Sequence, residues 1–272
     1  MDISISNIAW QPRQDEEIAL LFSRKNLRKI DIALTKYFPD LLSVSNSDVL
    51  KVKKWWASRD IEIYGIQALL FGQPSFNLFD ISSQNAMLNY LNKVCQISFL
   101  LGASRLVFGS PKARDLSRLG QRENAHEIAC QFFRKLGNIA ESHNVLMCLE
   151  PNPACYGSNF MLDTRSTLDV VKAVAHENIK IQLDTGAMLI NDEVPKLLVE
   201  DFWDNLGHIH ISQPSLEPLS QKYSAFHSNI ADEIRLHIPS STTAIEILIP
   251  IGEDPYFHIE KSIDIAISIY GD

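Results

Sequence analysis

The chain lacks an excess of basic residues and any paired-cysteine motif, and both shortages exclude classes of protein. Its 25 Lys and Arg residues are outnumbered by 33 Asp and Glu residues, which gives a net charge of −8. Nucleic-acid backbones are bound by clustered cations, so we expect no nucleic-acid partner. The four cysteines are scattered without a C-x-x-C pair, which is typical of a reducing compartment with unpaired thiols.

Targeting and membrane-spanning signals are also missing. No basic segment followed by an apolar segment opens the chain, and no uninterrupted apolar run reaches membrane-spanning length. Hydrophobic residues make up 46% and charged residues 21%, the composition of an ordinary globular protein that can bury a sizeable core. We therefore expect a cytoplasmic protein with no membrane partner.

Short apolar runs alternate with amphipathic stretches along the 272 residues. The strand candidates span residues 3–9, 29–34, 61–69, 105–108, 145–149, 180–183, 208–211 and 244–249. The helical patterns span residues 15–24, 47–58, 83–101, 123–143, 165–176, 194–206, 226–236 and 256–269. Strict alternation of this kind predicts a parallel sheet with helices between its strands.

The count of eight strands and eight helices predicts an α/β fold of the (β/α)8 TIM-barrel type. A doubly wound open sheet is the competing architecture. It is disfavoured because the segment that follows the first strand, within SISNIAWQPRQ, contains no glycine for a phosphate-binding turn. No linker or low-complexity tract divides the chain, so we expect one domain over residues 1–272.

Four acidic or imidazole side chains stand at the ends of the last four predicted strands. They are Glu150 in VLMCLEPN, Asp184 in IKIQLDTG, His210 in GHIHIS and Glu246 in TTAIEILIP. Each lies between apolar neighbours that point to the opposite face of its strand. The active site of such a barrel lies at the C-terminal ends of the strands, and adjacent parallel strands lie about 4.8 Å apart. The pattern predicts one site for a divalent ion such as Mn²⁺, Mg²⁺, Co²⁺ or Zn²⁺.

These motifs resemble the sugar phosphate isomerase/epimerase superfamily, the xylose-isomerase-like TIM barrels. The likeness is greatest to ketose 3-epimerases and hydroxypyruvate isomerases, and it runs through IDIALTKYF, GIQALLFG, ASRLVFGSPKAR, LEPNPACYGSNF, IQLDTG, HIHIS and AIEIL. The resemblance implies that Glu150, Asp184, His210 and Glu246 bind the metal and that the two glutamates form the acid/base pair. Two departures stand out. Ala187 occupies the place of a histidine in the D-T-x-H pattern of some relatives, and SQPSLEPLSQK supplies no arginine after the seventh strand.

Seven further residues are candidates for substrate contact. They are Trp10, Lys36, Gln67, Asn152, Tyr156, His208 and His227. His208 shares a strand face with His210, so it is either the ligand itself or a group that supports the ligand from behind. Lys36 and Lys222 either hold a phosphate or carboxylate of the substrate or are solvated. His227 either caps the helix that follows it or enters the site.

The resulting hypothesis is a metal-dependent isomerase or epimerase that moves a proton next to the carbonyl of a small carbohydrate through an enediolate. Three alternatives stay open: an inosose-type dehydratase, a non-catalytic barrel that binds a sugar or metal, and a nuclease like endonuclease IV. The nuclease is disfavoured because it needs several metals and a basic groove, and the first four strands end without a histidine. The sequence leaves homo-oligomerisation open.

Overall fold

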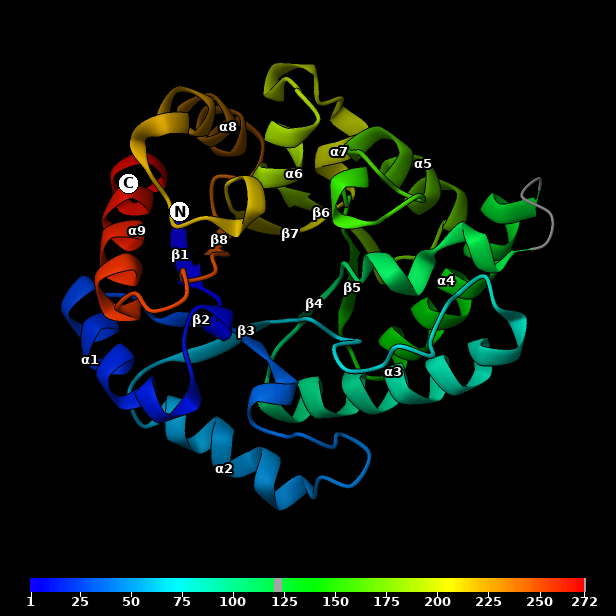
Figure 1. Cartoon of the computed structure of the whole chain (residues 1–272), viewed down its shortest axis with the longest axis horizontal. Helices are drawn as coiled ribbons and strands as arrows, with labels where there is room; N and C mark the ends of the chain where they lie inside the picture. Colours follow the sequence, from blue (N-terminus) through cyan, green and yellow to red (C-terminus); the bar gives the residue numbers. More distant parts are fainter. Residues whose placement is uncertain (120–123, 272) are drawn as a thin grey trace.

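The computed structural model describes residues 1–119 and 124–271 and forms a ring of parallel strands surrounded by helices (Figure 1). The strands are β1 Asp2–Ile5, β2 Lys29–Ala33, β3 Glu62–Gln67, β4 Arg105–Phe108, β5 Leu146–Leu149, β6 Ile179–Asp184, β7 Leu206–Ile211 and β8 Thr242–Ile245. They form one eight-stranded sheet in the order β1-β8-β7-β6-β5-β4-β3-β2. A parallel bridge between Ser6 and Asp31 joins the two ends of this order. The predicted (β/α)8 barrel is therefore confirmed.

Helices cover the outside of the ring. They are α1 Asp15–Lys25, α2 Asn46–Ala57, α3 Ile81–Leu101, α4 Ala125–Ser142, α5 Thr164–Val174, α6 Thr185–Ile190, α7 Glu200–Asp204, α8 Ser224–His237 and α9 Pro255–Tyr270. The predicted start of the fourth helix at residue 123 lies outside the described residues. In Figure 1 the C-terminal helix α9 lies close to β1, so the last element packs against the first.

The segment between β6 and β7 departs from the prediction. A single helix over residues 194–206 is wrong, because a 3-10 turn at Pro195–Leu197 and the short α7 occupy the region and β7 already begins at Leu206. The six-residue α6 was not predicted. Its sequence TGAMLI has a glycine in its first turn, and it forms because the Asp184 carboxylate accepts a hydrogen bond from the Ala187 N–H at 2.6 Å.

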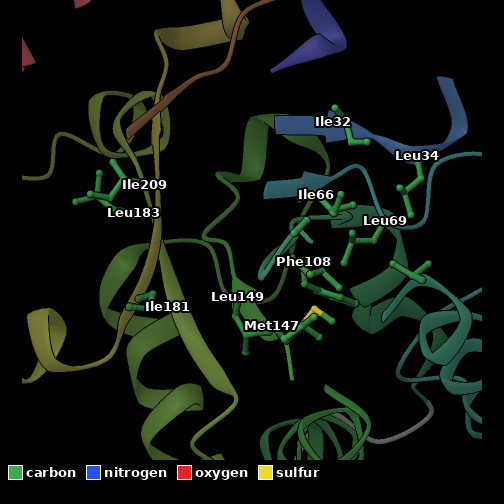
Figure 2. Packing of buried hydrophobic residues seen from close by; sticks show 14 of the residues in the cluster. Ile32, Leu34, Ile66, Leu69, Phe108, Met147, Leu149, Ile181, Leu183 and Ile209 are labelled. Carbon is green, nitrogen blue, oxygen red and sulfur yellow. The ribbon is translucent and has the colours of Figure 1, made fainter. Parts of the chain in front are cut away.

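The main core lies between the barrel and the helices. Figure 2 shows Met147 and Leu149 beside Phe108 of the neighbouring strand, with Ile181 and Leu183 on β6. All five side chains are buried. This is the apolar strand face that the alternating pattern predicts.

The inside of the barrel is polar, which is unusual because branched apolar side chains dominate the interior of most such barrels. Ser4, Asp31 and His208 come from β1, β2 and β7 and are all buried. Asp31 contacts His208 directly, although β2 and β7 are not neighbours in the sheet. This contact must therefore cross the interior. Within the described residues, no helix combines the length and the apolar character needed to cross a bilayer.

Candidate metal centre and active site

Glu150, Asp184, His210 and Glu246 converge at the C-terminal ends of β5 to β8. Each offers one ligand atom, and these atoms all lie within 4.8 Å of one another. Strand register explains the convergence in part, since Asp184 and His210 are directly opposed partners on β6 and β7. Glu150 and Glu246 each follow the last residue of their strand.

His210 lies at the centre of this group and is fully buried. Its Nδ1 atom is 3.4 Å from Oε1 of Glu150 and 3.2 Å from Oε2 of Glu246. Burial by itself lowers the pKa of His210, but the negative charges of Glu246 and Glu150 beside it raise it well above its ordinary value. The Nδ1 atom is thus the one that faces the carboxylates.

The Asp184 carboxylate accepts hydrogen bonds from the first turn of α6 and from the residue that follows β7. Its Oδ1 accepts from the Ala187 N–H at 2.6 Å, and its Oδ2 accepts from the Ser212 hydroxyl at 2.9 Å. Burial, with the charges of Glu150 and Glu246, raises the pKa of Asp184 to about 7. A cation that binds here therefore competes with a proton below neutral pH.

Each glutamate is held by a different amide side chain. Gln67 Nε2 donates to Oε1 of Glu246 at 2.5 Å, and Asn152 Nδ2 donates to Oε2 of Glu150 at 3.1 Å. Burial raises the pKa of Glu246, but His210 and the hydrogen bond from Gln67 outweigh it and hold the pKa below its ordinary value. Gly109 leaves the room that Glu150 occupies, because a Cβ at this position would lie 2.3 Å from Glu150 Oε2.

The four residues fit a divalent cation. Three carboxylates and an imidazole are a donor set that Mn²⁺, Mg²⁺, Co²⁺ and Zn²⁺ accept. Oε1 of Glu150 is buried and has no hydrogen-bond partner among the described residues. Three carboxylates desolvated together cost several kcal/mol each without a compensating charge, and a cation supplies that charge.

A cavity of about 450 Å³ opens above this group, which is a size that suits a small ligand. Glu150 and Glu246 form part of its wall, whereas Asp184 and His210 are not among the lining residues. The rest of the cavity wall combines polar and apolar residues. It consists of Ile8, Gln11, Ala33, Thr35, Lys36, Gln67, Ala68, Phe71, Val107, Gly109, Ser110, Leu216 and Leu248.

Of the seven predicted contact residues, Gln67 and Lys36 line the cavity. Lys36 Nζ donates to the backbone oxygens of Asn7 at 2.7 Å and Ile8 at 3.1 Å, and also to that of Trp10. An ammonium group has three hydrogens, so these carbonyls use all of them. Burial lowers the pKa of Lys36 to about 8. Lys36 therefore fixes the loop after β1 and has no hydrogen left for a phosphate.

Trp10, Asn152 and Tyr156 lie around the site but not in the cavity wall. The indole of Trp10 is buried and donates to Asp15 at 2.8 Å. Asn152 supports Glu150, as described above. The Tyr156 hydroxyl accepts from the Ser215 N–H at 2.8 Å.

The two remaining histidines have partners elsewhere. His208 Nε2 lies 2.6 Å from Oδ2 of Asp31, deeper in the barrel than the four candidate ligands. His227 is buried in α8, where its Nδ1 lies 2.7 Å from the Tyr270 hydroxyl. Neither residue is among those that line the cavity. Lys222 is also outside the cavity wall, in the turn before α8, with its ammonium over the Tyr223 ring.

Sequence reasoning missed several residues that shape the site. Asp31 was not among the predicted site residues, although a charged residue in the middle of the buried strand KIDIA is a usable signal. Ser212 and Gly109 act through contacts with Asp184 and Glu150. No local pattern marks a serine or a glycine of this kind, because its partner lies on another strand.

The comparisons with known proteins agree with the barrel fold. The family model described as "Xylose isomerase-like TIM barrel" matches residues 27–237, which is more than half of the chain. The chain belongs to the xylose isomerase-like TIM barrel family. No curated protein matches it in sequence.

Several solved structures share the fold at low sequence identity. D-psicose 3-epimerase from Clostridium cellulolyticum H10 matches with a TM-score of 0.81 and 15% identity over 100% of both chains. 3-Keto-D-glucoside 4-epimerase from E. coli matches with a TM-score of 0.74 and 16% identity, over 97% of this chain and 98% of that one. The probable 3-DHS dehydratase from Bacillus anthracis matches with a TM-score of 0.67 and 16% identity, over 98% and 99%.

Proposed function

We propose that this xylose isomerase-like barrel is a metal-dependent isomerase or epimerase that transfers a proton next to the carbonyl group of a sugar. The observation that carries the proposal is the pair of glutamates in the cavity wall, with Asp184 and His210 directly behind them. Several structures with the same fold are named as sugar 3- or 4-epimerases, which supports the assignment.

The two glutamates have the placement that acid/base chemistry needs. Glu150 and Glu246 come from β5 and β8, and they are the acidic groups that line the cavity. One carboxylate removes the proton on the carbon next to the carbonyl, which gives an enediolate. The other returns a proton to the opposite face for epimerisation, or to the neighbouring carbon for isomerisation.

The four-residue group would hold the cation, with Asp184 and His210 as its buried ligands. A divalent ion bound there would supply Lewis-acid stabilisation of the negative charge on the substrate oxygens. Gln67 and Asn152 keep the two glutamates pointed toward the cavity through hydrogen bonds of 2.5 and 3.1 Å.

The cavity favours an uncharged sugar over a sugar phosphate. Lys36 is the single basic residue among the described residues that line it, and all three of its ammonium hydrogens go to backbone carbonyls. The outer part of the wall is apolar: Phe71 is 70% exposed and Leu248 48% exposed. This lining also disfavours a nuclease, which needs a basic groove for the DNA backbone.

Incubation of the Mn²⁺- or Co²⁺-loaded protein with a panel of ketoses and ketose phosphates in D₂O tests the proposal. We expect deuterium to enter at the carbon beside the carbonyl of a free ketose, together with formation of its epimer or isomer. Absence of exchange with every sugar, by a protein shown to hold one metal ion per chain, would leave a non-catalytic binding barrel.

A dehydratase is the second candidate, because a probable dehydratase shares the fold over nearly its whole length. It would use the same proton abstraction but then expel a hydroxyl group as water. The same experiment separates the two reactions, since an isomerase conserves the mass of the substrate apart from deuterium. A product 18 mass units lighter would identify the dehydratase by simple loss of water.

A further inference from the structure

The buried carboxylate of Asp31 has no part in the acid/base chemistry above, yet it lies next to the metal-binding group. It is fully buried in the middle of β2. Its Oδ1 accepts from the Ser4 hydroxyl at 3.0 Å, and its Oδ2 lies 2.6 Å from His208 Nε2. Burial of a charged carboxylate costs desolvation free energy, so a structural or functional role for Asp31 is expected.

Asp31 also reaches the imidazole of His210. Oδ2 of Asp31 lies 3.9 Å from His210 Nε2, and this nitrogen has no hydrogen-bond partner among the described residues. The other nitrogen, Nδ1, faces Glu150 and Glu246. The two ring nitrogens therefore have different surroundings: one faces the site of the ion and the other faces Asp31.

The barrel makes specific room for this carboxylate. Gly65 on β3 is the in-register partner of Asp31. A Cβ at Gly65 would lie 2.1 Å from Oδ2 and 2.6 Å from Cγ of Asp31, so any larger residue would displace the carboxylate. Residue 65 must be a glycine, because a side-chain atom there would occupy the space of the Asp31 carboxylate.

We propose that Asp31 is a positioning residue for the metal centre, which selects the tautomer of His210 that carries its proton on Nε2. This inference rests on the metal centre of the proposed function. With the proton on Nε2 and directed at Asp31, the lone pair of Nδ1 is free for the ion. Histidine ligands of metals commonly donate their second N–H to a carboxylate, which orients the ring and makes it a better ligand.

His208 completes the arrangement as the partner that keeps Asp31 in place. Its ring meets the His210 ring edge-on, with centroids 5.2 Å apart. Its Nε2 lies against Oδ2 of Asp31, and His208 pairs with Gln182 two in-register pairs before the Asp184–His210 pair. Of the two roles open to His208 from the sequence, the geometry points to support of the ligand from behind.

Metal affinity of the full-length protein tests the proposal without any assay of activity. Isothermal titration with Mn²⁺ should show Asp31→Asn binding about 10- to 100-fold more weakly than the parent protein. Asp15→Asn is the matched control: Asp15 is also a buried carboxylate, but its partners are Trp10 and Tyr37 at the edge of the barrel. The Mn²⁺ affinity of Asp15→Asn should stay within about twofold of the parent value. This change is much smaller than the loss expected when a group that supports a metal ligand is removed.

A folded Asp31→Asn variant that binds Mn²⁺ as tightly as the parent would overturn the inference and leave the proposed function standing. A parent protein that binds no divalent ion would overturn both. A second readout needs no substitution: long-range ¹H–¹⁵N spectra of the Zn²⁺-loaded protein should place the His210 proton on Nε2. A proton on Nδ1 of His210 in the Zn²⁺-loaded protein would contradict the proposed tautomer.

Discussion

The amide nitrogen of Gln67 lies 2.5 Å from Oε1 of Glu246 and connects the end of β3 to the end of β8. Glu150 has a longer contact of 3.1 Å, to Asn152 on its own loop. The two glutamates of the cavity wall are therefore held by hydrogen bonds of different length from different parts of the barrel. This difference leads to separate expectations for the two sides of the site.

Replacement of Gln67 by leucine should weaken catalysis through Glu246. A hydrogen bond to a charged group is worth about 1.5–3 kcal/mol, so we expect kcat/KM to fall roughly 10- to 100-fold. Because Gln67 favours the ionised carboxylate, its loss should raise the pKa of Glu246 and move the acidic limb of the pH profile upward. Gln11→Leu, at a cavity residue that makes no hydrogen bond to either glutamate among the described residues, should leave that limb in place.

Replacement of either glutamate of the proposed acid/base pair by glutamine should stop interconversion but leave half of the exchange reaction. Glu150→Gln and Glu246→Gln should each lower turnover by about 10²- to 10⁴-fold. In each variant the remaining glutamate should still exchange the hydrogen next to the carbonyl with solvent, but for only one of the two epimers. The epimer that exchanges should differ between Glu150→Gln and Glu246→Gln. NMR of each epimer in D₂O measures this, with metal content checked and the exposed Glu200→Gln as control. Loss of exchange on the same epimer in both variants would indicate a single base.

Gly109→Ala should damage the site more than the fold. The new Cβ would lie 2.3 Å from Oε2 of Glu150, at the far end of a flexible side chain that can swing away at little cost. We therefore expect the thermal midpoint to change by only a few degrees, and turnover to fall by about 10²-fold because the displaced carboxylate leaves its reactive position. Parallel melting curves and rate measurements check both parts. A variant with normal rates would show that Glu150 does not need its present position.

Burial of His227 should make the protein sensitive to acid. Burial lowers its pKa to about 4 from an ordinary value of 6.5, so between these values the unfolded chain binds more protons than the folded one. This stability contribution is present above pH 6.5 and is lost as the pH falls toward 4. It amounts to roughly 2–3 kcal/mol.

Urea unfolding at pH 5 and pH 7 measures the effect. His227→Gln should show a smaller difference in unfolding free energy between the two pH values than the parent protein. His126→Gln removes an exposed imidazole and is the matched control, so it should keep the full difference. An unchanged pH dependence in His227→Gln would contradict the assignment.

The arrangement of the strands and the identity of the four central residues could be predicted from the sequence. Alternation along a strand decides which side chains share a face, and the order of elements decides that consecutive strands are parallel neighbours. Glu150, Asp184, His210 and Glu246 lie on consecutive strands, so local pattern and chain order were enough to bring them together.

The partners of these residues were decided by tertiary structure alone. Asp31 meets His208 across the interior of the barrel, between strands that are not neighbours in the sheet. Lys36 was open as a phosphate ligand until the fold placed three backbone carbonyls around its ammonium group. Contacts of this kind depend on how the ring closes and on strand register, and no pattern within one segment records either.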